Sequence, residues 1–181
     1  MGRTLVPLWP DTISEDPLAL VNKIRDAKMK AGIAISPDTP STAITDEIGN
    51  AVDMILVMTV YPGQWTSLHC LKVFDWRAGQ GGQKFIERCV PKVSELRARF
   101  PDQNIEVDGG VGPSNVGVCA HAGSSLICPL LSCLPVSQRR VGSNIVVAGT
   151  AIFNAKDPEG VIAQLKKTVD DEQARIAAER Q

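Results

Sequence analysis

Aromatic residues, clusters of one charge and long apolar runs are all scarce in this 181-residue sequence. Aromatic side chains make up only 4% of it, so the core must be built mainly from Val, Ile, Leu and Ala, as is typical of buried parallel strands and the helices that cover them. Nineteen Lys and Arg balance twenty Asp and Glu without a basic run, which argues against nucleic acid or an anionic membrane surface as a partner. With 44% hydrophobic and 22% charged residues, the chain has the composition of one soluble globular domain.

Membrane-spanning, targeting and disulfide signals are also missing. The longest apolar stretch, 124–136, is broken by Pro129 and Pro135 and is shorter than the ~20 residues of a membrane span. Residues 1–6 form no apolar signal core, so we expect a cytoplasmic protein. The five cysteines form no C-x-x-C pair and are odd in number, which predicts free thiols rather than a disulfide framework or a zinc knuckle. They are Cys70, Cys89, Cys119, Cys128 and Cys133.

Short apolar runs alternate with amphipathic segments along the chain. The runs predict strands at 31–36, 54–60, 105–108 and 144–148. The amphipathic segments predict helices at 17–29, 42–51, 84–99, 113–122 and from 158 into the charged tail. Strict alternation of strand and helix predicts an α/β fold with parallel strands and right-handed crossovers.

Turns of small residues lie near the expected strand ends, at Gly81-Gly82, Gly109-Gly110 and Gly149-Thr150. The carboxyl ends of parallel strands share one face, where glycines let a ligand approach backbone N–H groups and helix N-termini attract anions. The set, which Gly63 extends, therefore predicts a phosphate site. The alternative is that these glycines only end strands.

Asp108 is the best candidate for a catalytic residue. It stands directly before Gly109-Gly110, at the carboxyl end of an expected buried strand, where barrel enzymes place catalytic groups. Its carboxylate could act as a general acid or base, or as an oxygen ligand for a metal. An Asp before a Gly is also common in ordinary turns, so position alone leaves both interpretations open.

Four motifs occur in order along the chain. They read LVMTVYPG at 56–63, GGQKF at 81–85, EVDGGV at 106–111 and VAGTA at 147–151. Together they resemble the ribulose-phosphate 3-epimerase family. The resemblance implies a (β/α)8 TIM barrel of the ribulose-phosphate-binding type, an isomerase of the pentose phosphate pathway that interconverts D-ribulose 5-phosphate and D-xylulose 5-phosphate. It also implies a divalent metal, such as zinc, iron, manganese or cobalt.

The resemblance further implies roles for individual residues. Asp108 would be the second acid/base and a metal ligand, and Met58 would line the pocket beside the reacting carbons. The other implied contacts are Gly63, Gly81 and Gly82 in the loop over the substrate, and Gly109, Gly110, Gly149 and Thr150 in the phosphate cradle. In the implied mechanism one carboxylate removes the C3 proton to give an enediolate, a second returns a proton from the opposite face, and the metal stabilises the enediolate oxygens.

The earlier part of the family pattern does not occur in this sequence. A substrate-binding serine, a His-x-Asp, a Met-Asp-Gly and a further histidine are missing, residues 1–14 show no similarity to that half, and the match begins near Glu15. His69 and His121 do not match family ligands, and we expect His121 to be a solvated surface residue. The expectation is a truncated barrel without its N-terminal strands, with an incomplete metal site and little or no turnover.

Two stretches, 64–79 and 124–142, interrupt the pattern, and deleting each restores a continuous family-like sequence. Our hypothesis is that they are short introns translated in frame; genuine surface insertions are the alternative. Without them the chain is much shorter than the ~200–250 residues of a complete barrel. We therefore expect an open sheet of four strands, whose free edges favour aggregation or self-pairing as a homodimer.

Several functions stay open at this point. The first is an epimerase of the resembled family, acting on a pentose 5-phosphate. The second is a sugar-phosphate-binding module without turnover, the third is a related sugar-phosphate isomerase or synthase, and the fourth is a non-functional product of a faulty gene model. The continuous MTV-x-PG and GGQKF motifs argue against the third.

Overall fold

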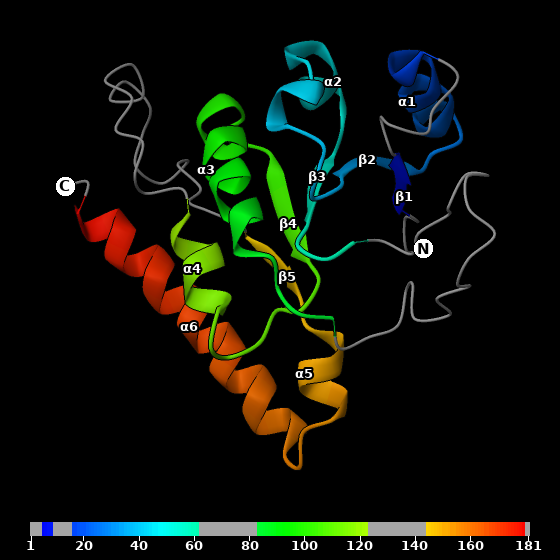
Figure 1. Cartoon of the computed structure of the whole chain (residues 1–181). Coiled ribbons are helices and arrows are strands. Elements are labelled where there is room, and N and C mark those ends of the chain that lie inside the picture. The colour runs from blue at the N-terminus through cyan, green and yellow to red at the C-terminus, as the bar shows by residue number, and fades with distance from the viewer. Residues whose placement is uncertain (1–4, 9–15, 62–82, 123–143, 180–181) are drawn as a thin grey trace.

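A parallel sheet organises the described part of the protein (Figure 1). The computed structural model describes residues 5–8, 16–61, 83–122 and 144–179. The strands lie side by side in chain order, and every neighbouring pair is parallel. They are β1 Leu5–Leu8, β2 Lys30–Ile35, β3 Met54–Met58, β4 Asn104–Asp108 and β5 Ile145–Val147.

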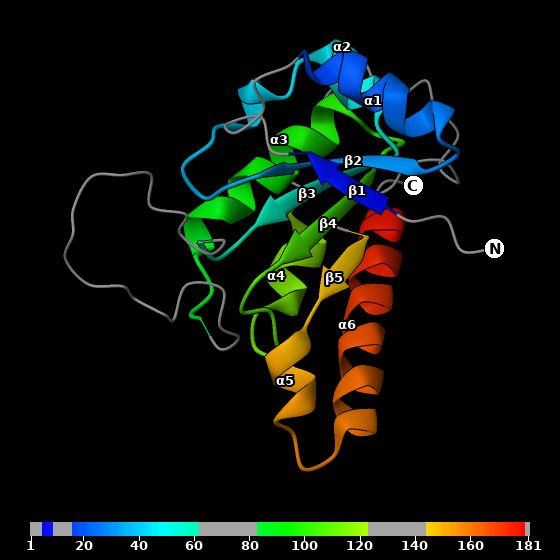
Figure 2. The ribbon, with the colours of Figure 1, turned by 90° about the vertical axis from the view of Figure 1, so that its right-hand side faces the viewer.

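The helices lie between these strands or follow the last of them, and they share one core with one face of the sheet (Figure 2). They are α1 Pro17–Asp26, α2 Asp46–Ala51, α3 Val90–Arg99, α4 Val116–His121, α5 Gly149–Phe153 and α6 Pro158–Glu179, with 3₁₀ turns η1 Ser41–Ala43 and η2 Glu87–Cys89. Among the helices of the described residues, none has the length and apolar character to cross a membrane.

Capping residues set where the helices begin. Asp16 caps α1 by accepting a hydrogen bond from the Leu18 N–H at 3.2 Å, directly before a first-turn proline. Thr45 caps α2 through the Ile48 N–H, so this helix begins later than the expected residue 42. The segment expected to be helical from 84 is likewise irregular up to η2, and α3 begins only at Val90.

Strand β4 shows how the sheet divides into two faces. Ile105 and Val107 are completely buried beneath the helices, whereas the side chains between and beside them, including Glu106 and Asp108, are partly exposed on the opposite face. Burying each of the aliphatic side chains contributes roughly 1.5–3 kcal/mol, which fixes the register of the strand, because a shift by one residue would exchange the faces. The polar face of β4 is thereby turned away from the helix layer.

The open parallel α/β sheet and its four expected strands are confirmed. The strand β1 was not predicted, because Pro7 argues against a strand; an edge strand tolerates a proline that cannot donate to the ladder. The short helix α5 was also missed, since it has only five residues and begins with a glycine.

Several expectations fall outside the described residues. These are the stretches 64–79 and 124–142, the glycines 63, 81 and 82, His69, and three of the cysteines. The other two cysteines, Cys89 and Cys119, are buried free thiols as predicted, and burial raises the pKa of Cys119 to about 11.

Candidate active site at the carboxyl ends of the strands

A cavity of about 290 Å³ lies where β4 and β5 end. Four of the residues predicted for the site line it: Asp108, Gly110, Gly149 and Thr150. The other lining residues are Val60, Gln83, Val111, Val147, Phe153 and Asn154. The structure thus brings together the acidic candidate and two of the predicted glycine turns, which are about forty residues apart in the chain.

Asp108 supplies the ionisable group of this cavity. It is the last residue of β4, and burial raises the pKa of its carboxyl group. Glu106 lies two residues earlier on the same face, and its pKa is raised by burial and by the negative charge of Asp108. A carboxyl group that holds its proton more readily than a free aspartate is suited to exchange protons with a ligand.

The turn after Asp108 is held in an unusual backbone conformation. Gly109 and Gly110 have φ angles of 120° and 65°, which side-chain-bearing residues rarely adopt. The Thr59 hydroxyl lies 2.6 Å from the Gly109 carbonyl oxygen, and the Thr59 N–H donates to the Asp108 carbonyl at 2.8 Å. On the other side, the Asn115 amide donates to the Gly110 carbonyl at 3.0 Å.

The second glycine turn comes from the junction of β5 and α5. A methyl group built on Gly149 would meet no atom within 4 Å, so the backbone there is open to an approaching ligand. Strand β5 has only three residues and is anchored by Asn144 just before it. The Asn144 side chain accepts the Ile105 N–H at 2.8 Å and donates to the Asn104 side chain at 3.0 Å.

Two of the residues predicted for the site, Met58 and Gly109, are not among those that line this cavity, and His121 differs from its expected surroundings. Met58 is the register partner of Asp108 on the neighbouring strand, but it is 8% exposed and does not line the cavity. Gly109 is buried within the turn and does not line it either. His121 is not simply solvated, because its Nδ1 lies 3.1 Å from Glu172 Oε2 and 2.6 Å from Arg175 Nη2, both on α6.

Sequence reasoning missed Thr59, Gln83 and Asn115. Thr59 lies inside the motif at 56–63, but no local pattern predicts that its hydroxyl group binds the turn after β4. Asn115 follows a Gly-Pro-Ser sequence, a turn signal that could have drawn attention to its side chain.

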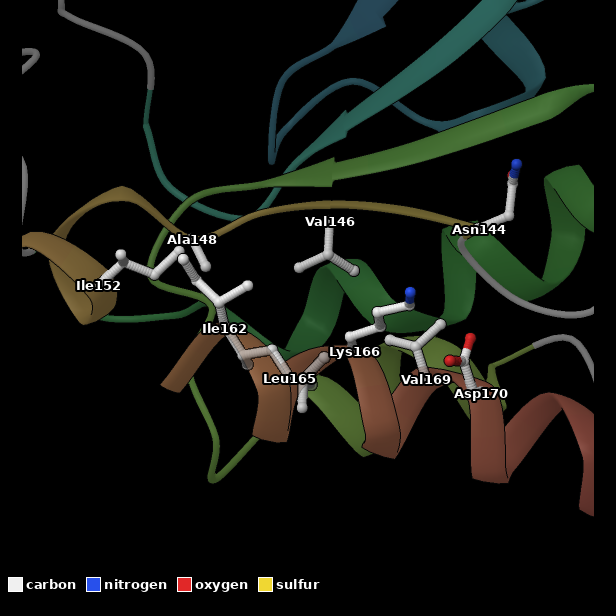
Figure 3. Close-up of a pocket in the computed structure, with 10 residues that line it drawn as sticks. Asn144, Val146, Ala148, Ile152, Ile162, Leu165, Lys166, Val169 and Asp170 are labelled. Carbon is white, nitrogen blue, oxygen red and sulfur yellow. The ribbon is translucent and has the colours of Figure 1, made fainter. Parts of the chain in front are cut away.

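A second cavity, of about 310 Å³, lies on the helix-covered side of β5 (Figure 3). Val146, Leu165 and Val169 line it from β5 and α6, together with the charged residues Lys166 and Asp170 (Figure 3). Its lining is mostly aliphatic, and it contains none of the residues predicted for the site. The candidate site is therefore the cavity at Asp108, where a carboxyl group and the glycine backbone of two turns meet.

The described residues do not by themselves fit a metal ion. In the part of the chain that the structure describes, no group of three or more His, Cys, Asp or Glu side chains is close enough to hold one. Asp108 could supply one oxygen ligand, whereas protein metal sites of this kind use at least three protein ligands. Any further ligands would have to come from outside the described residues.

Comparisons with known proteins identify the family. The model of the ribulose-phosphate 3 epimerase family matches residues 8–129. The chain belongs to this family. The ribulose-phosphate 3-epimerase of Candida glabrata is 38% identical over 159 residues, which cover 88% of this chain and 50% of the yeast protein. The cytoplasmic isoform from Oryza sativa subsp. japonica is 35% identical, over 85% of this chain and 53% of its own length.

The chain spans about half the length of the curated relatives it matches. The family match also begins at residue 8, earlier than the expected start near Glu15. The crystal structure of 3-hexulose-6-phosphate synthase from Salmonella typhimurium has a similar fold, with a TM-score of 0.54 and 18% identity, over 93% of this chain and 62% of the synthase. The sheet is therefore a partial barrel of the TIM type, with strands in barrel order.

Proposed function

We propose that this chain forms part of the active site of a ribulose-phosphate 3-epimerase and binds a pentose 5-phosphate there. The observation that supports this most strongly is the shared cavity, in which the Asp108 carboxyl group faces the same space as Gly110, Gly149 and Thr150. The proposed substrates are D-ribulose 5-phosphate and D-xylulose 5-phosphate. The glycine turns would hold the phosphate and Asp108 would act at the sugar carbons.

The chemistry assigned to Asp108 is proton transfer at C3. The C3–H bond of the ketose is acidic because the neighbouring C2 carbonyl can take up the negative charge as an enediolate. A carboxyl group with a raised pKa can donate a proton to this carbon, and its carboxylate form can remove one in the reverse direction. Inversion also requires a second acid/base on the opposite face of C3, which the described residues that line this cavity do not provide.

The divalent metal implied by the family remains part of the proposal, with zinc, iron, manganese and cobalt as candidates. Asp108 would contribute one ligand to it. When bound, such a metal would stabilise the developing negative charge on the sugar oxygens. The described residues do not complete its coordination, so the steps assigned to Asp108 are those of the carboxyl group alone.

A second candidate function is binding of a sugar phosphate without turnover. It is favoured by one observation: among the described residues that line the cavity, Asp108 is the only acid or base. The glycine backbone could still hold a phosphate, while inversion at C3 would lack its second carboxylate.

One experiment separates the two functions. The purified chain is assayed for xylulose 5-phosphate formation from ribulose 5-phosphate by a coupled assay, with and without zinc or manganese, and ribulose 5-phosphate binding is measured by calorimetry. Turnover that disappears in Asp108→Asn but persists in Asp102→Asn, an exposed aspartate in the α3–β4 loop, supports the epimerase. Binding without turnover supports the second function, and a folded chain with neither contradicts both.

Self-association and a cytoplasmic location belong to the same proposal. Among the described residues, strands β1 and β5 form the two edges of the sheet, and their unpaired backbone groups support pairing of two copies. Light scattering at increasing protein concentration would detect such a homodimer. The cytoplasmic isoform named among the relatives supports the proposed location.

A further inference from the structure

Thr59 has a buried hydroxyl group that contacts the carbonyl oxygens of two successive peptide groups. The residue has no exposed surface and follows directly after β3. Its Oγ1 lies 3.0 Å from the Asp108 carbonyl oxygen and 2.6 Å from the Gly109 carbonyl oxygen. The Asp108 carbonyl already accepts a hydrogen bond from the Thr59 backbone N–H. The hydroxyl group has only one proton to donate, and we assign it to the Gly109 carbonyl because that contact is the shorter one.

Two consecutive carbonyl groups, of Asp108 and Gly109, therefore point toward β3. In a regular strand successive carbonyls point to opposite sides, so the Gly109 carbonyl would otherwise face β5. The φ angle of 120° at Gly109 reverses it, and this angle is accessible because glycine has no side chain. A methyl group at Gly109 would lie 2.4 Å from a Val60 methyl carbon, so the turn is also tightly enclosed.

The reversal determines the direction of the next N–H group. A trans peptide is planar, so its N–H points away from its carbonyl. With the Gly109 carbonyl held against Thr59, the Gly110 N–H points away from β3 toward the side of β5, from which Gly149 and Thr150 reach the cavity. Gly110 lines that cavity and is exposed, and within the described residues its N–H has no hydrogen-bond acceptor.

We propose that Thr59 is a positioning residue, which aims the Gly110 N–H into the cavity as a fixed donor for a phosphate oxygen. Asn115 supports the same turn by holding the Gly110 carbonyl from the opposite end. The proposal rests on the proposed function, because it takes the phosphate group of a sugar phosphate as the ligand. It adds a residue that does not touch the ligand and acts only by orienting a peptide group.

The test measures binding of inorganic phosphate to the full chain and to three variants, by NMR titration with the Gly110 N–H resonance as the reporter. Thr59→Val keeps the shape of the side chain and removes the hydroxyl; Thr59→Ser keeps the hydroxyl. Thr168→Val is the matched control, because it removes a hydroxyl that binds a carbonyl within α6, away from the cavity. We expect phosphate to shift the Gly110 resonance, Thr59→Val to bind about tenfold more weakly, and the other two variants to bind like the parent chain.

Each outcome decides the matter. If the parent chain binds phosphate and Thr59→Val binds equally well, the positioning role is wrong while the proposed function stands. If phosphate binds without shifting the Gly110 resonance, the assignment of the Gly110 N–H as a donor is wrong. This result comes from the parent chain alone, so it can be obtained even if Thr59→Val fails to fold. If the parent chain does not bind phosphate at all, the proposed function fails together with this inference.

Discussion

Replacing Arg97 with Met should both destabilise the protein and disturb the site, because this buried residue ties β5 to the α3–β4 connection. Arg97 is 3% exposed. Its Nη1 donates to the carbonyls of Phe100, Pro101 and Gln103, at 3.3, 3.0 and 2.7 Å. Its Nη2 donates to the Asn144 side chain at 3.1 Å, and Asn144 in turn aligns β5 with β4.

The expected loss of stability follows from the hydrogen-bond donors that these four acceptor groups lose in the substitution. The Phe100 carbonyl lies in the buried part of the contact and would lose its charged donor at a cost of about 1–2 kcal/mol. The other three acceptors are partly buried and can regain water, so each contributes about 0.5 kcal/mol. Since Met keeps most of the aliphatic volume, we expect a loss of about 3 kcal/mol in the free energy of unfolding, a large part of the ~5–15 kcal/mol of a typical domain.

Urea denaturation followed by circular dichroism measures this loss, with Arg88→Met as the control. Arg88 forms an exposed ion pair with Asp38, the two side chains being 57% and 67% exposed, so its removal should leave the free energy of unfolding nearly unchanged. A double-mutant cycle of Arg97→Met with Asn144→Ala should reveal coupling between the two residues. Equal, small losses for Arg97→Met and Arg88→Met, or additive effects in the cycle, would refute the reasoning.

Three further predictions concern the site. Asp108→Asn should abolish any turnover while the chain stays folded, as judged by the coupled assay and circular dichroism; unchanged turnover would show that the catalytic residue lies elsewhere. Gly110→Ala should destabilise the fold by about 2 kcal/mol in a urea titration, because residue 110 has a φ of 65° and the added methyl group would lie 2.7 Å from backbone atoms of Gln83 and Phe85. The control is Gly112→Ala, whose methyl group would meet only Ala151, at 3.5 Å, and which should cost little stability. The raised pKa values of Glu106 and Asp108 mean that the folded state binds protons more tightly, so their contribution to stability is largest below the ordinary pKa values of ~4 and is lost as the pH rises toward the raised values. The double variant Glu106→Gln/Asp108→Asn should lose this decline in urea titrations from pH 4 to 7, and an identical pH profile would contradict the assigned shifts.

Much of the fold could be predicted from the sequence because its signals are local. The segments 54–58 and 105–108 mark strands, and every second residue of β4 is buried. Asp16 marks the start of α1 through a hydrogen bond to the N–H group two residues later. The strand β1 escaped prediction for a non-local reason. Its proline disfavours a strand, and only its position at the edge of the sheet, beside β2, makes that residue acceptable.

The candidate site was predictable in its composition. Asp108, Gly110, Gly149 and Thr150 stand at or just after strand ends, and parallel strands bring their carboxyl ends to one edge, so their proximity follows from strand order. Met58 is the register partner of Asp108 and is buried, but it is not among the described residues that line the cavity, and its predicted contact with a ligand stays a prediction. The sequence predicts a surface position for His121, but not its contacts with Glu172 and Arg175 on α6, because these residues lie about fifty positions away in the chain.

The sequence by itself therefore determined the class of fold, the family and the acid at the strand end, since each depends on residues close together in the chain or on the order of the strands. Only the tertiary structure decided how the turn after Asp108 is oriented. Thr59 lies about fifty residues from Gly109, and a hydrogen bond between them forms only when β3 and β4 are paired in their native register. Hydrogen-bond direction depends on the positions of the two groups in space, and no local sequence pattern contains that information.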